Sequence, residues 1–201
     1  IIFGEGNFLF TKDNKYNYLT HSEKIMKYTY DLKLPVKNKN FFLKSDQLEK
    51  NHLSGTNNGI FITLDSHHDQ NNWEINNYIK IISKLISYDV KIFINFSPKK
   101  LHFLKKIPKE ISGSNKVLFT HNKSILEIMK IINSCKFVVG NETGPICLGA
   151  SLKKEVHSIY LPIHTRPESQ IINNDNFYYN ADNEENESII EKITSRILKK
   201  I

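Results

Sequence analysis

Short apolar runs alternate with amphipathic stretches along most of the chain after residue 59. Five runs have the length and composition of buried strands, and they cover residues 60–64, 90–96, 117–119, 137–139 and 156–161. Between and after them lie five predicted helices: four at 75–86, 98–106, 145–152 and 187–200, and one that begins after Ser124. Because parallel strands need crossover helices, the alternation predicts an α/β fold: a Rossmann-like parallel sheet with helices on both faces.

Two of these helices have clear signals at the residue level. Ser124 is a candidate N-cap, and the face that follows it is predicted to carry Ile125, Ile128, Met129 and Ile132. The closing helix is predicted to turn five residues inward: Ile189, Ile190, Ile193, Ile197 and Leu198. Apolar residues at three- and four-residue steps are typical of a helix that packs on a sheet.

The first part of the chain has a different pattern. A helix is predicted from Ser22 to Leu32, Pro35 ends it, and polar residues over 44–58 indicate a linker. We therefore predict two parts: residues 1–55 are the end of another domain plus a linker, and residues 56–201 form one Rossmann-like domain. The chain starts without Met or a signal-peptide pattern, so we expect it to be a fragment of a longer protein.

Composition narrows the class of protein. Lys and Arg number 28 against 21 Asp and Glu, a net charge of +7, which favours anionic partners such as nucleotides, phosphorylated sugars or an acidic membrane face. The alternative is a compositional bias towards Lys, Asn and Ile. No RNA-binding signature is present, so nucleic acid is not expected as a partner. No apolar run reaches the roughly 20 residues of a membrane span, and two cysteines exclude a disulfide scaffold. We therefore expect a cytoplasmic protein.

The most informative segment follows the fourth predicted strand and reads Gly140-Asn141-Glu142-Thr143-Gly144-Pro145. It opens a helix of small residues that includes Cys147. The free N–H groups and positive dipole end of such a helix form a seat for a diphosphate, with Thr143 adding a hydroxyl and Gly144 leaving room. The alternative is an ordinary strand–turn–helix connection, since neither a G-x-G-x-x-G nor a Walker motif is present.

Residues 137–150 resemble the signature of glycosyltransferase family 9, the ADP-heptose:lipopolysaccharide heptosyltransferases, which reads roughly V-V-G-N-D-T-G-P-x-H-L-A-A. Further similarity lies at Trp73-Glu74, which resembles the family's K-x-W-P segment, and at 118–133, 159–167 and 21–34. The resemblance covers most of the chain in the same order and spacing.

This resemblance implies a GT-B architecture of two Rossmann-like domains, of which this chain holds the C-terminal, donor-binding one and the tail of the acceptor domain. It implies transfer of a sugar from a nucleotide-diphosphate donor to a lipid-linked or oligosaccharide acceptor, without a metal or other cofactor. The implied donor diphosphate and sugar contacts are Asn141, Glu142, Thr143, Gly144, Cys147 and Asn71. The implied nucleoside contacts are Ser97, Lys99, Thr120, His121 and Ser124, and Arg166 is a candidate phosphate contact. The resemblance also implies that the general base lies in the N-terminal domain, and it makes peripheral attachment to the inner membrane an option.

The chain departs from the family signature at several positions. Glu142 replaces an Asp, Cys147 replaces a His, Asn71 replaces a Lys and Glu74 replaces a Pro. Because the Lys and the His are missing, a second hypothesis stays open. In it, the chain is a degenerate or stand-alone domain that binds a nucleotide sugar or phosphate but transfers no sugar. A third reading is an unrelated Rossmann-like domain that binds a phosphorylated ligand. Without the other half of the active site, residues 1–201 alone are expected to be inactive.

Metal binding and thiol catalysis are two further hypotheses that the sequence does not favour. His67 and His68 beside Asp65 and Asp69 contain metal-ligating residue types, but adjacent His side chains point in different directions and no third ligand follows at fixed spacing. Cys147 near Glu142 could suggest a thiol nucleophile. A cysteine on a helix that packs on a sheet is more typically a small apolar filler.

Overall fold

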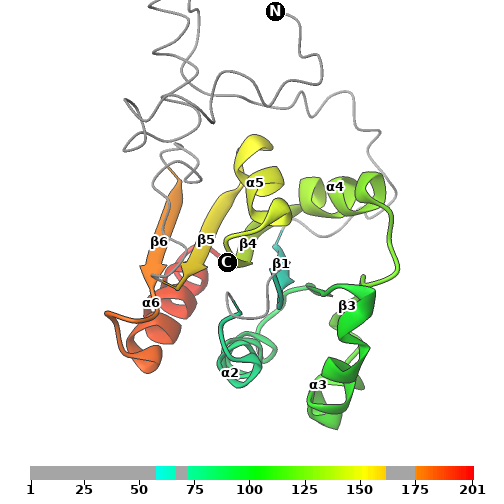
Figure 1. The fold of residues 1–201 in the computed structure, drawn as a ribbon, viewed down its shortest axis with the longest axis horizontal. Coiled ribbons are helices and arrows are strands. Elements are labelled where there is room, and N and C mark those ends of the chain that lie inside the picture. Colours follow the sequence, from blue (N-terminus) through cyan, green and yellow to red (C-terminus); the bar gives the residue numbers. More distant parts are fainter. Residues whose placement is uncertain (1–57, 67–71, 162–174) are drawn as a thin grey trace, which may run out of the picture. The chain divides into compact units, whose positions relative to one another are not determined.

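The computed structural model describes residues 58–66, 72–161 and 175–201. Its centre is a six-stranded, fully parallel sheet in the order β3-β2-β1-β4-β5-β6 (Figure 1). The strands are β1 (Gly59–Thr63), β2 (Ile92–Asn95), β3 (Val117–Phe119), β4 (Cys135–Asn141), β5 (Glu155–Tyr160) and β6 (Asn176–Asn180). This arrangement confirms the predicted Rossmann-like α/β fold.

Helices cover both faces of the sheet. They are α2 (Ile75–Leu85), the 3₁₀ helix η4 (Pro98–Lys105), α3 (Lys109–Ser112), α4 (Ile125–Ser134), α5 (Gly144–Ser151) and α6 (Asn186–Leu198). Helices α2 and α6 pack together on one face, and α4 and α5 pack together on the other (Figure 1). In the part of the chain that is described, no helix is long and apolar enough to cross a membrane.

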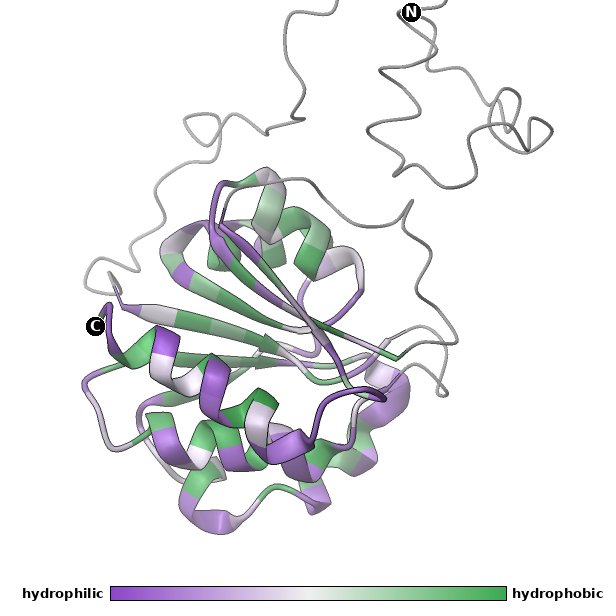
Figure 2. Cartoon of the chain, turned by 90° about the vertical axis from the view of Figure 1, so that its left-hand side faces the viewer, coloured by the Kyte–Doolittle hydropathy of each residue, from purple (hydrophilic) through white to green (hydrophobic). Residues whose placement is uncertain are grey.

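The alternation of side chains along each strand supplies both faces of the core. Ile60 and Ile62 of β1 belong to the large cluster that includes the α2 and α6 side chains. The intervening Phe61 is also fully buried, and its Cβ points to the opposite face because successive strand residues alternate. Both faces of β1 are therefore apolar, as expected for the central strand of a parallel sheet. Figure 2 shows hydrophobic residues along the strands of the sheet, whereas the covering helices alternate between hydrophobic and hydrophilic residues.

The predicted capping of α4 by Ser124 is confirmed. The Ser124 hydroxyl accepts a hydrogen bond from the backbone N–H of Glu127 at 3.3 Å, and the Glu127 carboxylate accepts one from the Ser124 N–H at 2.8 Å. This reciprocal pair is a capping box. It fixes where α4 begins, just beyond the end of β3.

The predicted inner face of α4 is confirmed at Ile128 and Ile132, which are buried, and is wrong at Ile125, which is 65% exposed. Met129 is half-buried, and Ile131, which was not predicted, is buried as well. Ile125 stands at the first position of the helix, past the carboxyl ends of the strands, and so has no sheet beneath it. It lines a cleft instead.

The structure adds two elements that sequence reasoning did not predict, the single-turn helix α3 and the edge strand β6. Strand β6 is attached partly through polar groups: the buried His157 ring of β5 contacts the Tyr179 hydroxyl of β6 at 2.9 Å and the Glu155 carboxylate at 3.2 Å. Burial lowers the pKa of His157, which favours the neutral imidazole.

The predicted parts 1–55 and 56–201 meet outside the described residues, so that boundary stays a prediction.

Two glycines let elements approach closely. A Cβ added at Gly140 of β4 would lie 2.2 Å from the Thr63 methyl and 2.7 Å from the Thr63 carbonyl oxygen of β1. A Cβ added at Gly149 of α5 would lie 2.8 Å from a Val138 methyl. A Cβ added at Gly144 would meet nothing within 4 Å. Gly140 and Gly149 are therefore required by packing, whereas Gly144 is not.

We predict that Gly140→Ala lowers the free energy of unfolding by about 1–3 kcal/mol, because the new methyl overlaps the backbone of β1 as well as a side chain. Gly144→Ala is the matched control and is expected to leave that free energy within about 0.5 kcal/mol. Urea unfolding of the two variants checks this. Equal stabilities would contradict the close packing of β1 and β4.

Candidate functional site

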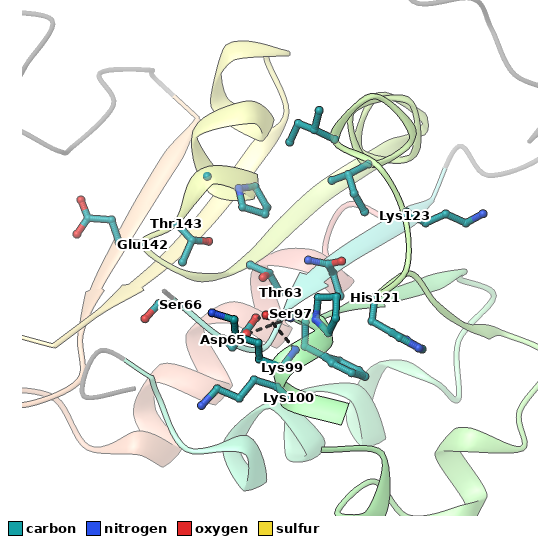
Figure 3. Close-up of a pocket in the computed structure, with 17 residues that line it drawn as sticks. Thr63, Asp65, Ser66, Ser97, Lys99, Lys100, His121, Lys123, Glu142 and Thr143 are labelled. Atoms are coloured by element: carbon teal, nitrogen blue, oxygen red, sulfur yellow. Dashed lines mark hydrogen bonds between the residues drawn. The ribbon is translucent and has the colours of Figure 1, made fainter. Parts of the chain in front are cut away.

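A cleft of about 830 Å³ lies at the carboxyl ends of β1, β2, β3 and β4. Its walls come from the loops that follow these four strands and from the start of α4 (Figure 3). The lining residues are Thr63, Asp65, Ser66, Asn95, Phe96, Ser97, Pro98, Lys99, Lys100, His121, Lys123, Ile125, Ile128, Glu142, Thr143, Gly144 and Pro145. In open parallel sheets this edge is where ligands bind.

The cleft sits where the chain connections diverge. Strands β1 and β4 are neighbours in the sheet, but the chain leaves β1 for α2 on one face and leaves β4 for α5 on the other. Such a switch point opens a crevice because no connection crosses it. The position of the cleft therefore follows from the strand order.

The N-terminus of α5 forms one wall. Thr143 is its N-cap in extended backbone conformation, with φ −147° and ψ 175°. The Thr143 hydroxyl caps no backbone N–H, and it is a buried oxygen with no hydrogen-bond partner among the described residues. The first N–H groups of a helix have no acceptor within the helix. Because Thr143, Gly144 and Pro145 line the cleft, these unpaired donors lie at its wall, beside the open space at Gly144. Figure 3 shows Thr143 at this wall.

The opposite wall is tied together by Asp65. Its carboxylate oxygens accept hydrogen bonds from the Ser97 N–H at 3.0 and 3.2 Å, so the residues after β1 hold the residues after β2 (Figure 3). The Ser97 hydroxyl in turn accepts from the Lys99 N–H at 3.3 Å and caps η4. These bonds fix where the Lys99 and Lys100 side chains enter the cleft.

The far end of the cleft presents an aromatic pair. The His121 ring stacks on the Phe96 ring, with centroids 4.9 Å apart and an interplanar angle of 7°. The Nδ1 atom of His121 is buried and has no hydrogen-bond partner among the described residues. Neighbouring Thr120 points its hydroxyl into the protein, donating to the Asn95 side-chain oxygen at 3.1 Å.

Both charge signs line the cleft. Lys99, Lys100 and Lys123 contribute cations, and Asp65 and Glu142 contribute carboxylates. Lys123 forms an ion pair with Glu127 at 3.0 Å, whereas Lys99 and Lys100 lie on the same side of the cleft as Asp65 (Figure 3). An anion entering the cleft would meet these lysines opposite the α5 N-terminus.

The structure brings together six of the residues predicted from sequence. Glu142, Thr143, Gly144, Ser97, Lys99 and His121 all line the cleft. Asn141, Cys147, Thr120 and Ser124 do not line it, and Asn71 and Arg166 lie outside the described residues. Thr120 and Ser124 instead hold the loop after β3 and the start of α4 in place.

Asn141 acts behind the cleft rather than at its surface. The side chain is 1% exposed, and its oxygen accepts a hydrogen bond from the Trp73 N–H at 3.0 Å. The Trp73 indole N–H donates to the Asn186 side chain at 2.6 Å. Asn141 therefore links the end of β4 to the entry of α2, and Trp73 in turn links that entry to the start of α6.

Cys147 is half-buried one turn into α5. Burial first, and then the nearby Glu142 carboxylate, raise the pKa of its thiol above the usual value. A thiol that stays protonated is a poor nucleophile, which agrees with the interpretation of Cys147 as a small apolar filler.

Within the described ranges no group of three or more His, Cys, Asp or Glu could hold a metal ion. His67, His68 and Asp69 lie outside these ranges.

Sequence reasoning missed several lining residues: Thr63, Asn95, Phe96, Ile128 and Pro145. The last three are apolar and were predicted elsewhere: Phe96 in a strand, Ile128 on the inner face of a helix, and Pro145 at the start of a helix. Thr63 and Asn95 are the last residues of β1 and β2. Their place at the carboxyl ends of adjacent parallel strands is the signal that could have identified them.

The sequence matches glycosyltransferase family 9 (heptosyltransferase) over residues 10–194, and the chain therefore belongs to this family. No curated protein matches the chain. Three similar solved structures share the fold. They are E. coli heptosyltransferase WaaC with ADP (18% identity, TM-score 0.60, 77% of this chain and 46% of that one), the same enzyme with ADP-2-deoxy-2-fluoro heptose (17%, 0.63, 86% and 51%), and a family 9 glycosyl transferase from Veillonella parvula (13%, 0.66, 90% and 60%). The present chain thus spans about half the length of these proteins.

We predict that Asp65→Ala lowers the free energy of unfolding by about 1–3 kcal/mol, because the Ser97 N–H loses its acceptor in a buried place. Asp65→Asn keeps a side-chain oxygen at the same position and is expected to lose less. Chemical unfolding of both variants checks this. If the two substitutions are equally costly, the hydrogen bond to Ser97 is not what joins the two loops.

Proposed function

We propose that this chain is the donor-binding part of a glycosyltransferase that transfers a sugar from a nucleotide-diphosphate donor to a lipopolysaccharide or other cell-surface saccharide. One observation carries the proposal: the unpartnered Thr143 hydroxyl and the N-terminus of α5 line a cleft at the sheet's switch point. Membership of family 9 supports the reaction class. The solved WaaC structures with ADP and with an ADP-sugar analogue support the donor class.

In this proposal the donor diphosphate lies against Thr143 and Gly144. The α5 N–H groups and the Thr143 hydroxyl would donate hydrogen bonds to phosphate oxygens, and the helix dipole would favour their charge. Lys99 and Lys100 would approach from the opposite wall. Glu142 would face the sugar, since it adjoins Thr143 and a carboxylate is repelled by phosphate.

The reaction needs this arrangement because charge develops on the leaving group. An acceptor hydroxyl oxygen forms a new bond to the anomeric carbon of the donor sugar. The bond from that carbon to the phosphate oxygen breaks, and its electron pair leaves with the nucleoside diphosphate. Donors already oriented at the α5 N-terminus stabilise that charge without reorganisation. We assign the base that takes the acceptor's proton to the part of the enzyme that this chain does not span.

The nucleoside would occupy the end of the cleft at Ser97 and His121. The Nδ1 atom of His121 is available for a polar contact, and the stacking on Phe96 holds the ring in one orientation. Ile125 and Ile128, both in α4, supply apolar surface to the wall of the cleft. A flat base and a polar ribose fit such a mixed wall.

A second candidate function is donor binding without transfer. It is favoured by Cys147 and Asn71, which replace the His and the Lys of the family signature, and so remove two groups able to donate to phosphate. Residues 1–201 taken alone are proposed to bind donor but not to transfer sugar. Sugar-transfer and binding assays on the same sample separate the two candidates.

We predict that Gly144→Val weakens ADP binding by at least about tenfold while the fold is retained. The added side chain would fill space that is open beside Thr143, and it would meet no protein atom at Cβ. Isothermal titration calorimetry with ADP measures the affinity, and thermal unfolding checks the fold.

Cys147→Ala is the control for that experiment, because the residue is on the same helix but does not line the cleft. It is expected to leave ADP affinity unchanged. A folded Gly144→Val protein with wild-type affinity would overturn the proposed diphosphate site.

A further inference from the structure

The segment that connects β2 to β3 is unusually cationic, and it also exposes apolar side chains. Over residues 98–109 it reads Pro98-Lys99-Lys100-Leu101-His102-Phe103-Leu104-Lys105-Lys106-Ile107-Pro108-Lys109, with no acidic residue before the exposed Glu110. Leu101 is 49% exposed and Leu104 is 37% exposed. Its proposed role in donor binding concerns only the beginning, at Lys99 and Lys100.

Buried apolar side chains anchor this segment to the core of the domain. Phe103, Ile107 and Ile111 are buried in the same core cluster as α2, and the Phe103 ring contacts the Phe96 ring edge-on at 6.0 Å. Residues three apart in a 3₁₀ helix lie above one another. Leu101 and Leu104 therefore form one outward row, with His102 and Lys105 forming the next.

The lysines of this segment beyond the cleft are not neutralised by carboxylates. Lys105, Lys106 and Lys109 are exposed, and no ion pair within the described ranges includes them. By contrast, Lys80 and Lys84 of α2 are paired with Glu187 and Glu191 of α6. The positive surface charge at the end of η4 is thus available to an outside partner.

From this arrangement we infer that residues 101–109 form a docking surface for an anionic lipid bilayer. Lys105, Lys106 and Lys109 contact the headgroups, and Leu101 and Leu104 enter the interface between headgroups and acyl chains. Exposed leucines beside lysines favour a bilayer over a soluble polyanion. A polyanion would bind the lysines, but it offers no apolar environment in which the two leucines could be buried. Interfacial binding adds buried apolar area to the attraction of cations for anionic lipid.

The inference is independent of the diphosphate site, because the surface residues lie beyond the cleft lining. If the proposed function also holds, the docked surface would keep the enzyme on the membrane that carries a lipid-linked acceptor. The two claims can fail separately: one is tested with vesicles and the other with ADP.

The test is co-sedimentation of the whole 201-residue chain with vesicles of phosphatidylcholine alone, and with vesicles containing about a third phosphatidylglycerol. We expect binding to the anionic vesicles only. Each lysine near an anionic surface contributes enough to change the partition coefficient several-fold, so Lys105→Gln with Lys106→Gln is expected to lower it about thirtyfold. Leu101→Ser with Leu104→Ser is expected to lower it as well, with the charge unchanged.

The control is Lys80→Gln with Lys84→Gln, which removes the same charge from another surface and is expected to have little effect. All these side chains are exposed, so thermal unfolding should stay near that of the unmodified protein. Three results would overturn the inference: no binding to anionic vesicles, equal losses in the control and the Lys105/Lys106 variant, or binding that is insensitive to the leucine substitutions. The last result would identify a general polyanion surface instead.

Discussion

The close approach of β1 and β4 is the constraint on which the site depends. Gly140 faces Thr63 in the register of these strands, and there is no room for a Cβ between them. Beyond this contact the chain leaves β1 towards one face of the sheet and β4 towards the other. The cleft opens where that tight contact ends, and Thr143 stands three residues past Gly140.

The site is built mainly from backbone and from short polar side chains held by the loops around it. Asp65 binds the Ser97 N–H, Asn141 binds the Trp73 N–H, and Ser124 and Glu127 cap α4. The first two bonds each fix one loop relative to its neighbour, and the cap fixes the start of α4. The Thr143 hydroxyl remains unsatisfied within the described residues, and it faces the cleft that these bonds define. A buried hydroxyl without a partner is costly in a finished core, so it points to a ligand.

Much of this could be predicted from the sequence, because the signals are local. Apolar runs identified β1 to β5, and Ser124 marked the start of α4. Strand β6 was missed because its Asn-Phe-Tyr-Tyr-Asn sequence is short and has only one buried side chain, Tyr179. Its attachment through His157 depends on a contact 22 residues away in the chain.

Residues that line the cleft could be predicted where they belong to a sequence motif. They could not be predicted where only the tertiary structure brings them to the cleft. Thr143 and Gly144 belong to a recognisable segment, whereas Ile125 looked like a core residue and lies at the open edge. The role of Asn141 was invisible in sequence, since a loop asparagine can face either way. Its side chain turns inward to Trp73, 68 residues distant in sequence.

The central claim is that a nucleotide's diphosphate rests on the N-terminus of α5. A crystal structure of the chain with ADP tests it most directly. The account predicts phosphate oxygens within hydrogen-bond distance, about 2.7–3.2 Å, of the Thr143 hydroxyl and of the first α5 N–H groups. A diphosphate bound elsewhere, with the space beside Gly144 empty, would contradict it.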